Sequence, residues 1–99
     1  MYQKRQPYRN KKIRQAAKDE ECLANFPGCQ GGTETTVFCH LNEQWAGKGM
    51  GQKADDCAGF FGCANCHREY DSNMFQNNDM LLRAYYRTIR RLIDKGVLK

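Results

Sequence analysis

Four of the six cysteines stand in two short pairs, and this feature limits what the chain can fold into more than any other. Cys22 and Cys29 flank a turn rich in proline and glycine, and Cys63 and Cys66 form a Cys-x-x-Cys motif. A chain of 99 residues has room for one small core, and such domains often need disulfides or a bound metal for stability. The two pairs therefore predict a cross-link between distant parts of the chain.

The N-terminal region helps to decide between disulfides and metal. Residues 1–18 are basic and contain no apolar run that resembles a signal-peptide core. No stretch of the chain reaches the ~18 apolar residues of a membrane span. We therefore expect a cytoplasmic protein without a membrane partner and with reduced thiols, a setting in which clustered cysteines more often bind metal.

Zinc is the metal that the paired cysteines favour, because it prefers four tetrahedral ligands and two thiol pairs supply them. The Cys-x-x-Cys-His string is also compatible with c-type haem attachment or a redox cycle. Haem attachment belongs to exported proteins, however, and no βαβ pattern surrounds the motif. We expect Cys39 and Cys57 to be small, partly buried side chains. The alternative is that one of them replaces a zinc ligand or that Cys39 binds a second metal.

The pattern of apolar and turn residues predicts a single α+β domain over residues 1–99. Strand signals come from β-branched and aromatic residues, and helix signals from caps and from a period of three to four residues. The expected elements are a flexible basic arm over residues 1–9, a helix from Asn10 to about Glu21, strands over 34–41 and 57–62 joined by a glycine-rich loop, and a helix after the Cys-x-x-Cys motif.

The last segment has the strongest helical period. Asn78 or Asp79 can cap an amphipathic helix that runs from about Met80 to Lys95 and ends at Gly96. Apolar residues recur at three- and four-residue steps, and most arginines fall on the other side. The expected buried stripe consists of Leu82, Tyr85, Tyr86, Ile89, Leu92 and Ile93.

Basic residues gather at the two ends of the chain, whose formal net charge is +5. Residues 4–18 contain no acidic side chain, and residues 83–95 contain only Asp94. Two basic ends around a nearly neutral centre suggest a polyanion such as nucleic acid as partner, with two solvated helix faces as the alternative. The two-stranded ribbon and the Tyr85/Tyr86 pair also leave room for a homodimer.

The chain has two histidines, His40 at the end of the better strand and His67 directly after the Cys-x-x-Cys motif. If this strand packs against the following helix, one imidazole could activate a water and the other could hold a divalent ion. Phosphodiester hydrolysis needs both functions. The alternative is a packed strand residue at His40 and a surface cap at His67.

Three strings give the chain a resemblance to a known family. ECLANFPGCQGGTETTVFCHL, GKGMGQKADDC and CANCHREYD resemble the YbcO-like family of small phage and prophage nucleases. More broadly, they are similar to the HNH (His-Me finger) nucleases with a ββα-metal core. The similarity runs from about Ile13 to Asp71. Its most specific parts are the PGC-x-G turn, the T-x-V-x-x-H strand and the C-x-x-C-H motif.

The resemblance implies a zinc-stabilised ββα-metal core flanked by an N-terminal and a C-terminal helix. It assigns His40 as the general base and His67 as a ligand of a catalytic Mg²⁺ or Mn²⁺. It also implies that the structural Zn²⁺ is held by Cys22, Cys29, Cys63 and Cys66.

Two positions depart from the HNH pattern. Cys39 stands where these enzymes usually keep a metal-binding aspartate, and Ala58 and Gly59 lie where an asparagine is expected. Asp56, or less readily Asp55, is then the candidate oxygen ligand, because Mg²⁺ prefers a carboxylate to a thiolate.

The function implied by the resemblance is a metal-dependent DNA endonuclease that acts in phage recombination or replication in a bacterial host cell. A zinc-stabilised DNA- or protein-binding module without chemistry explains the cysteines and the charge equally well. The basic side chains expected to contact nucleic acid are Lys11, Lys12, Arg14, Lys48, Lys53, Arg68 and Arg87.

Overall fold

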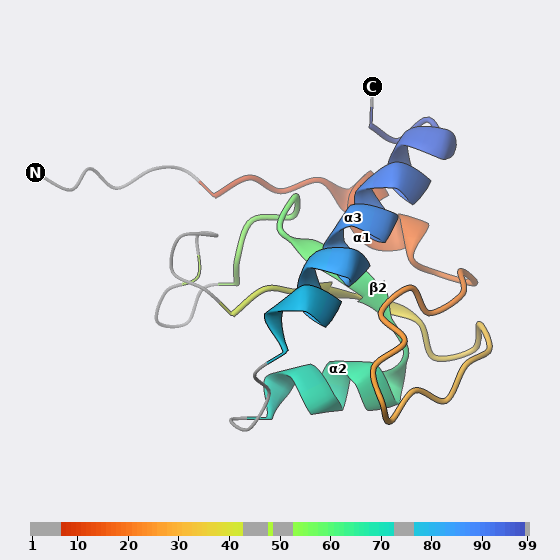
Figure 1. Ribbon diagram of the computed structural model, residues 1–99. Coiled ribbons are helices and arrows are strands. Elements are labelled where there is room, and N and C mark those ends of the chain that lie inside the picture. The colour runs from red at the N-terminus through yellow and green to blue at the C-terminus, as the bar shows by residue number, and fades with distance from the viewer. Residues whose placement is uncertain (1–6, 43–47, 49–52, 73–76, 99) are drawn as a thin grey trace, which may run out of the picture.

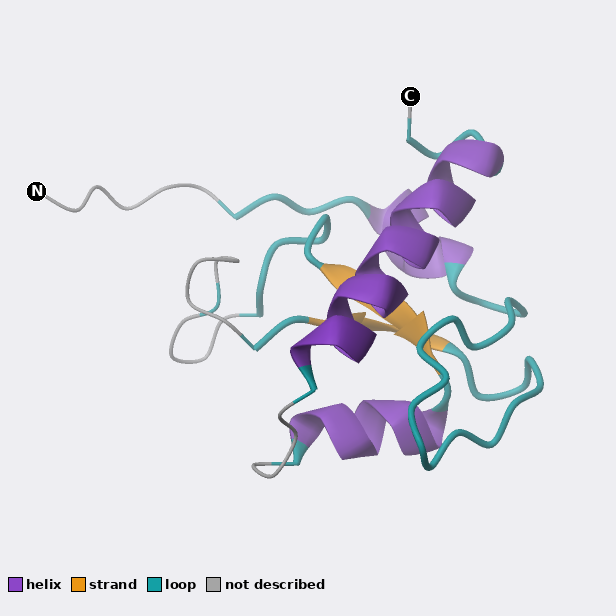
Figure 2. Cartoon of the chain, in the orientation of Figure 1, coloured by secondary structure: helices purple, strands orange, loops and turns teal. Residues whose placement is uncertain are grey.

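The computed structural model describes residues 7–42, 48, 53–72 and 77–98, which form a two-stranded ribbon with three helices around it (Figures 1 and 2). The expected α+β class and order of elements are confirmed. No described helix has the length and apolar character to cross a membrane. The elements are α1 (Lys11–Ala16), β1 (Val37–His40), β2 (Gly59–Gly62), α2 (Ala64–Asp71) and α3 (Asn78–Asp94).

Helix α1 begins where its cap predicts. The side chain of Asn10 accepts hydrogen bonds from the backbone amides of Lys12 and Ile13 at 3.0 and 3.4 Å. Of the expected flexible arm over residues 1–9, residues 1–6 lie outside the described residues, and residues 7–10 are tied to the chain before β2. The backbone amide of Tyr8 donates to Asp55 Oδ1 at 3.2 Å, and Arg9 donates to the carbonyl of Ala54 at 2.9 Å.

The two strands pair antiparallel, with His40 opposite Gly59 and Cys39 opposite Phe60. A Cβ at position 59 would lie 2.5 Å from the carbonyl oxygen of Cys39 and 2.6 Å from the ring of Phe38. Glycine is therefore required opposite His40. The first strand is shorter than expected, because residues 34–35 form a turn after two glycines with positive φ.

Neighbouring residues of the ribbon point to opposite faces and build two apolar clusters. Phe61 faces a cluster with Ile13 of α1 and Leu92 of α3, whereas Phe60 faces the cysteines and Tyr70 of α2. Helix α3 runs across the ribbon, from near α2 at its first turn to near α1 at its last (Figure 1). The ribbon therefore separates a cysteine-lined side from a side that faces α1.

Helix α3 turns a different face to the ribbon from the one that the apolar period predicts. The buried residues of α3 are Ala84, Thr88 and Leu92. Of these three, only Leu92 belongs to the stripe that was expected to be buried. The Thr88 hydroxyl accepts a hydrogen bond from the Phe61 amide and donates to the Ala84 carbonyl, both at 2.9 Å. Two small residues thus let α3 approach β2 closely.

The expected burial is wrong for three residues of the stripe. Leu82, Tyr86 and Ile93 are 64%, 69% and 46% exposed. The cap is also shifted, since the side chain of Asn77 accepts from the amide of Met80. The expected end of the helix holds, because Gly96 follows its last turn with φ of 76°.

The last turns of α3 are bound to the end of α1 and the segment after it. Lys95 Nζ donates to the Ala16 carbonyl at 3.0 Å and to Glu20 Oε2 at 2.7 Å, and Arg91 pairs with both Glu20 and Glu21. The hydrogen bond from Lys95 holds the pKa of Glu20 below its usual range. These two basic side chains therefore serve the fold and are not free for a polyanion.

Candidate metal centre and histidine site

The structure brings the four paired cysteines together. The Sγ atoms of Cys22 and Cys66 are 3.6 Å apart and those of Cys29 and Cys63 are 4.0 Å apart, with all four within 4.8 Å of one another. A tetrahedral Zn²⁺ with Zn–S bonds of ~2.3 Å would hold its sulfurs about 3.8 Å apart. Both the donor set and its spacing therefore fit a structural zinc ion.

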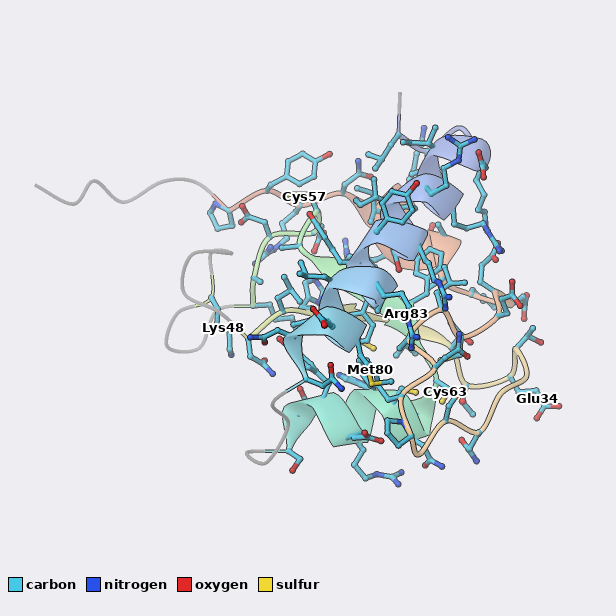
Figure 3. The ribbon with its side chains drawn as sticks, viewed as in Figure 1. Glu34, Lys48, Cys57, Cys63, Met80 and Arg83 are labelled. Atoms are coloured by element: carbon cyan, nitrogen blue, oxygen red, sulfur yellow. The ribbon has the colours of Figure 1, made fainter. Side chains whose placement is uncertain are left out.

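Each pair is positioned by a short turn. Cys63 is the residue before the first turn of α2, and Cys66 lies within that turn, so the helix start presents both thiols on one side. In the other pair, the Cys29 amide donates to the Phe26 carbonyl at 2.9 Å and closes the turn. Figure 3 shows Cys63 where the loop that carries Cys22 and Cys29 meets the start of α2. Local turns thus explain why cysteines that are paired in the sequence also lie close together in the structure.

The electrostatics of the cluster favour a bound cation. Burial raises the pKa of the Cys66 thiol, and ionisation of the adjacent Cys22 thiol raises it further. Burial also disfavours ionisation of Cys63, but hydrogen bonds from the amides of Cys66 and Gln30 outweigh it and lower the pKa to about 6. Four adjacent thiols can all ionise only when a cation offsets their charge, which a zinc ion does.

The remaining cysteines differ from the expected partial burial in opposite directions. Cys39 is fully buried beside the cluster, and burial raises its pKa. Cys57 is exposed and lies at the other end of β2 from Cys63 (Figure 3). Neither belongs to the group of four, so neither replaces a zinc ligand.

On the opposite face of β1, His40 is paired with Asp56. His40 Nε2 lies 2.7 Å from Asp56 Oδ1, and the Asp56 side chain is 1% exposed. The other carboxylate oxygen accepts from the Asn10 amide at 2.7 Å and from Arg14 Nε at 2.9 Å. The N-terminal segment and α1 therefore hold Asp56, and Asp56 in turn holds the imidazole.

The surroundings of Asp56 keep it ionised. Burial by itself raises the pKa of this carboxyl, but hydrogen bonds from His40 and Asn10 and the charge of Arg14 lower it below the usual range. A carboxylate only accepts hydrogen bonds, so His40 Nε2 carries the proton. In the neutral imidazole, Nδ1 then has the free electron pair.

Asp56 was expected to offer an open oxygen ligand to a catalytic metal. In the structure, both of its carboxylate oxygens already accept hydrogen bonds from protein donors. Asp55, the other acidic candidate, accepts from the Tyr8 amide and is buried. No local sequence pattern indicates these contacts, because their partners lie more than forty residues earlier in the chain.

His67 has a carboxylate partner of its own. His67 Nε2 lies 3.3 Å from Asp71 Oδ2, one helical turn later on α2, and both side chains are exposed. The Asn42 side chain, just after β1, donates to Asp71 Oδ1 at 3.0 Å. Sequence analysis missed Asp71, although its spacing of four residues from His67 was a usable signal.

The two histidines do not share one compact cluster of ligands. Among the described residues, the four cysteines are the one group of three or more Cys, His, Asp or Glu side chains close enough to hold a common metal. The His40 ring packs edge-on against Phe38, with centroids 5.1 Å apart, on the side that faces α1. Cys39 points to the other side, toward the cysteines and α2.

The basic residues expected to contact nucleic acid fall into three places. Those at the ends of α1 and on the loop before β2 are exposed, apart from the half-buried Lys48 (Figure 3). Arg68 on α2 is exposed and bonds to Asn65. Arg87 lines a pocket on α3. The first group, on α1 and on the loop before β2, consists of Lys11, Lys12, Arg14, Lys48 and Lys53.

Trp45 and most of the glycine-rich loop lie outside the described residues.

The fold and the cysteine cluster define a small α+β protein built around a site that can hold a structural metal ion. The model of the family "Putative nuclease YbcO" matches residues 11–97, and the chain belongs to this family.

A solved structure of "a putative bacteriophage protein from Escherichia coli str. K-12 substr. MG1655" is similar to it. The TM-score is 0.66 and the sequence identity 26%, over 86% of this chain and 100% of the other. The curated proteins contain no significant sequence match. Membership of a nuclease family makes nucleic acid the expected substrate.

Proposed function

We propose that the protein is a metal-dependent DNA endonuclease of the HNH type that acts in phage recombination or replication, in the cytoplasm of a bacterial host. Family membership supports nuclease activity. The observation that carries the finer proposal is the 2.7 Å contact between His40 and the buried, ionised Asp56. This contact orients the imidazole of the residue to which the HNH resemblance assigns the role of general base.

His40 would act as the base through Nδ1. Asp56 holds the proton on Nε2 and fixes the orientation of the ring, so Nδ1 can take a proton from the attacking water. The negative charge of Asp56 also stabilises the imidazolium that forms. Asp56 is therefore a positioning residue in this proposal, in place of the metal-binding role expected from its sequence position.

A catalytic Mg²⁺ or Mn²⁺ would be held at His67. The exposed Asp71 carboxylate beside His67 supplies an oxygen donor, which these ions prefer. The residues present therefore fit a divalent ion better at α2 than at Asp56. When bound, the ion would stabilise negative charge on the phosphate and on the leaving oxygen.

DNA would approach along α1. The exposed Lys11 and Lys12 follow the cap of this helix, and Arg14 reaches Asp56 while remaining 47% exposed. Lys11 and Lys12 have no ion-pair partner in the described part of the chain, so their charge would attract a phosphodiester to α1, which packs against β1. No base-reading element is present in the described part of this surface, so we expect recognition through the phosphates.

The alternative is a zinc-stabilised DNA- or protein-binding module without catalysis. The buried Cys39 favours it, because a buried thiol with a raised pKa stands where HNH enzymes usually keep a metal-binding aspartate. Such a module would bind DNA in proportion to its Lys and Arg contacts and leave it intact.

A cleavage assay on linear, single-stranded and branched DNA distinguishes the two functions. Zinc-loaded protein is tested in buffer without divalent ions and with added Mg²⁺ or Mn²⁺. The nuclease proposal predicts cleavage that requires the added ion and that needs a higher ion concentration in His67→Ala. DNA binding without cleavage under every condition, by folded protein that contains zinc, would support the binding module.

A further inference from the structure

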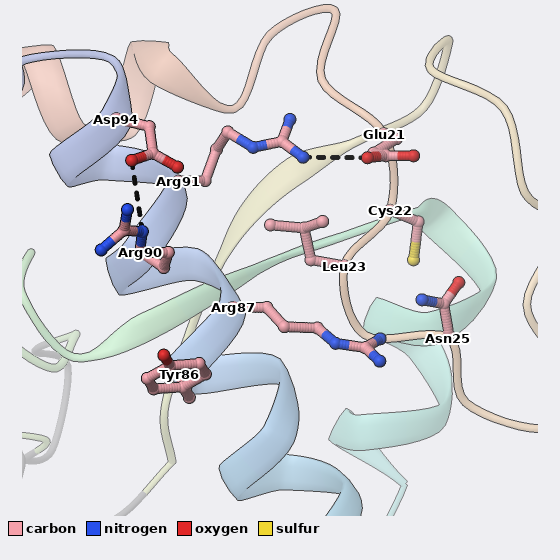
Figure 4. A pocket seen from close by; sticks show the side chains of 9 residues that line it. All are labelled: Glu21, Cys22, Leu23, Asn25, Tyr86, Arg87, Arg90, Arg91 and Asp94. Carbon is pink, nitrogen blue, oxygen red and sulfur yellow. Dashed lines mark hydrogen bonds and ion pairs between the residues drawn. The ribbon is translucent and has the colours of Figure 1, made fainter.

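An open pocket of about 390 Å³ lies between α3 and the segment of residues 21–25, which precedes the turn at Cys29 (Figure 4). Helix α3 contributes Tyr86, Arg87 and Arg90, and the segment contributes Cys22 and Asn25. Pockets of this volume hold one small molecule or one unit of a polymer. The pocket is on α3 and does not include the His40–Asp56 pair, so the nuclease proposal leaves it without a role.

One positive charge in this pocket is not compensated. Arg91 is paired with Glu21, and Arg90 Nε lies 3.2 Å from Asp94 Oδ1. Arg87 is exposed and has no hydrogen bond or ion pair within the described part of the chain. Figure 4 shows its side chain extending from α3 toward Cys22 and Asn25. A single free guanidinium matches a group with one negative charge, such as a phosphodiester.

An aromatic ring from α3 lines the same pocket. Tyr86 is 69% exposed, although the apolar period predicts that it is buried. The close packing of Thr88 against β2 turns α3 so that Tyr86 faces outward. An exposed ring and a free arginine that line one pocket are a combination that binds single-stranded nucleic acid, since the ring can stack on a base while the guanidinium holds the phosphate.

We propose that the Tyr86–Arg87 pocket binds one unpaired nucleotide of a DNA substrate, with its base on Tyr86 and its phosphate at Arg87. The proposal rests on the proposed nuclease function for the identity of the polymer. A base inside a duplex has both faces covered by its neighbours and cannot stack on a protein ring. The pocket therefore gives the protein a preference for DNA with a single-stranded end, gap or branch over continuous duplex.

The competing explanation is that Arg87 serves only the metal centre. Cys22 lines the pocket, and four thiolates around Zn²⁺ carry a net negative charge that a nearby arginine offsets. In that case, loss of Arg87 weakens zinc binding and leaves strand preference unchanged. Zinc content therefore has to be measured together with DNA binding.

The test is fluorescence anisotropy with a labelled blunt duplex and with the same duplex carrying a single-stranded tail, in buffer without Mg²⁺ or Mn²⁺. The variants are Tyr86→Ala, Tyr86→Phe and Arg87→Gln, with Lys18→Gln, in the turn after α1, as the charge-matched control. All three positions are exposed, so the folds of the four variants should remain intact. Zinc content and circular dichroism of each variant verify this.

We expect Tyr86→Ala to weaken binding of the tailed duplex about 10-fold and Tyr86→Phe to change it less than about 2-fold, because the ring is retained. Arg87→Gln should weaken it about 3- to 10-fold and lower the slope of log affinity against log salt by about 0.7. Affinity for the blunt duplex should change less than about 2-fold in all variants.

Equal losses on both duplexes, no loss, or loss of zinc from Arg87→Gln would overturn the proposal. The cleavage assay is independent of this result. If wild-type protein cuts DNA without strand preference, the nuclease proposal holds and the pocket proposal fails. If the protein cuts no DNA but binds tailed duplex more tightly through Tyr86 and Arg87, the pocket proposal holds and the nuclease proposal fails.

Discussion

The cysteine centre and the His40–Asp56 pair lie on opposite faces of one short ribbon, and they are held in different ways. The cysteines come from two local turns and need a cation to bring their charges together. His40 and Asp56 are held by hydrogen bonds from α1 and the segment before it. A metal ion bound by the cysteines would therefore support the fold, whereas the N-terminal segment supports the candidate base.

The largest expected effect comes from breaking the cysteine side. Cys63→Ser removes one of four zinc ligands, and structural zinc contributes folding free energy directly, so most of the stability of so small a domain should be lost. Circular dichroism and bound zinc would be measured together. The exposed Cys57→Ser is the matched control and should retain both. A folded, metal-free Cys63→Ser protein would contradict the role given to the cysteine centre.

Gly59→Ala strains the ribbon that separates the two sites. The new methyl group would lie 2.5 Å from a backbone oxygen of β1, so the strands must move apart, at a cost of about 3 kcal/mol in the free energy of unfolding. Denaturant unfolding measures this cost. Gly59 pairs with His40 at the end of β2 that is distant from Cys63. The variant should therefore still bind zinc under conditions in which it is folded. A loss below about 0.5 kcal/mol would show that the strands do not approach so closely.

Asp56→Asn weakens the histidine side and should have the smallest effect on stability, about 2 kcal/mol, because it removes a buried charge that accepts three hydrogen bonds. The folded-state pKa of Asp56 is lowered. Its contribution is therefore complete above the ordinary carboxyl pKa and is lost as pH falls through the lower folded value.

The cost of Asp56→Asn should consequently not diminish between about pH 7.5 and about pH 5, where Asp56 stays ionised. Denaturant unfolding of wild type and variant at both pH values gives this difference. Zinc content should match wild type at each pH. A cost that disappears at the lower pH would mean that the carboxyl titrates in this range and is not held as an ion.

The sequence predicted what depends on local pattern. The Asn10 cap, the turn that closes Cys29 and the start of α2 at the Cys-x-x-Cys motif all arise from residues within one or two turns of each other. The cluster of four cysteines follows from these local turns. The two strands were expected in the correct places and in the correct pairing, although the first is shorter than its β-branched residues suggested.

What the sequence could not predict depends on contacts between distant residues. The apolar period of α3 allowed two neighbouring faces, and the hydrogen bond between Thr88 and the Phe61 amide selects the one with small residues. Asp56 was expected to bind metal, but its hydrogen-bond partners include Asn10 and Arg14, which lie near the N-terminus and more than forty residues earlier. Such pairings follow from the packed fold and leave no periodic signal.

We propose that a metal bound by the cysteines holds the fold while His40, oriented by Asp56, performs the chemistry. The most direct test measures zinc content, thermal unfolding and DNA cleavage on one preparation of His40→Ala, beside wild type. The account predicts unchanged zinc, a melting temperature close to wild type and cleavage reduced at least about 100-fold. Cleavage at the wild-type rate by His40→Ala, or loss of zinc together with activity, would contradict it.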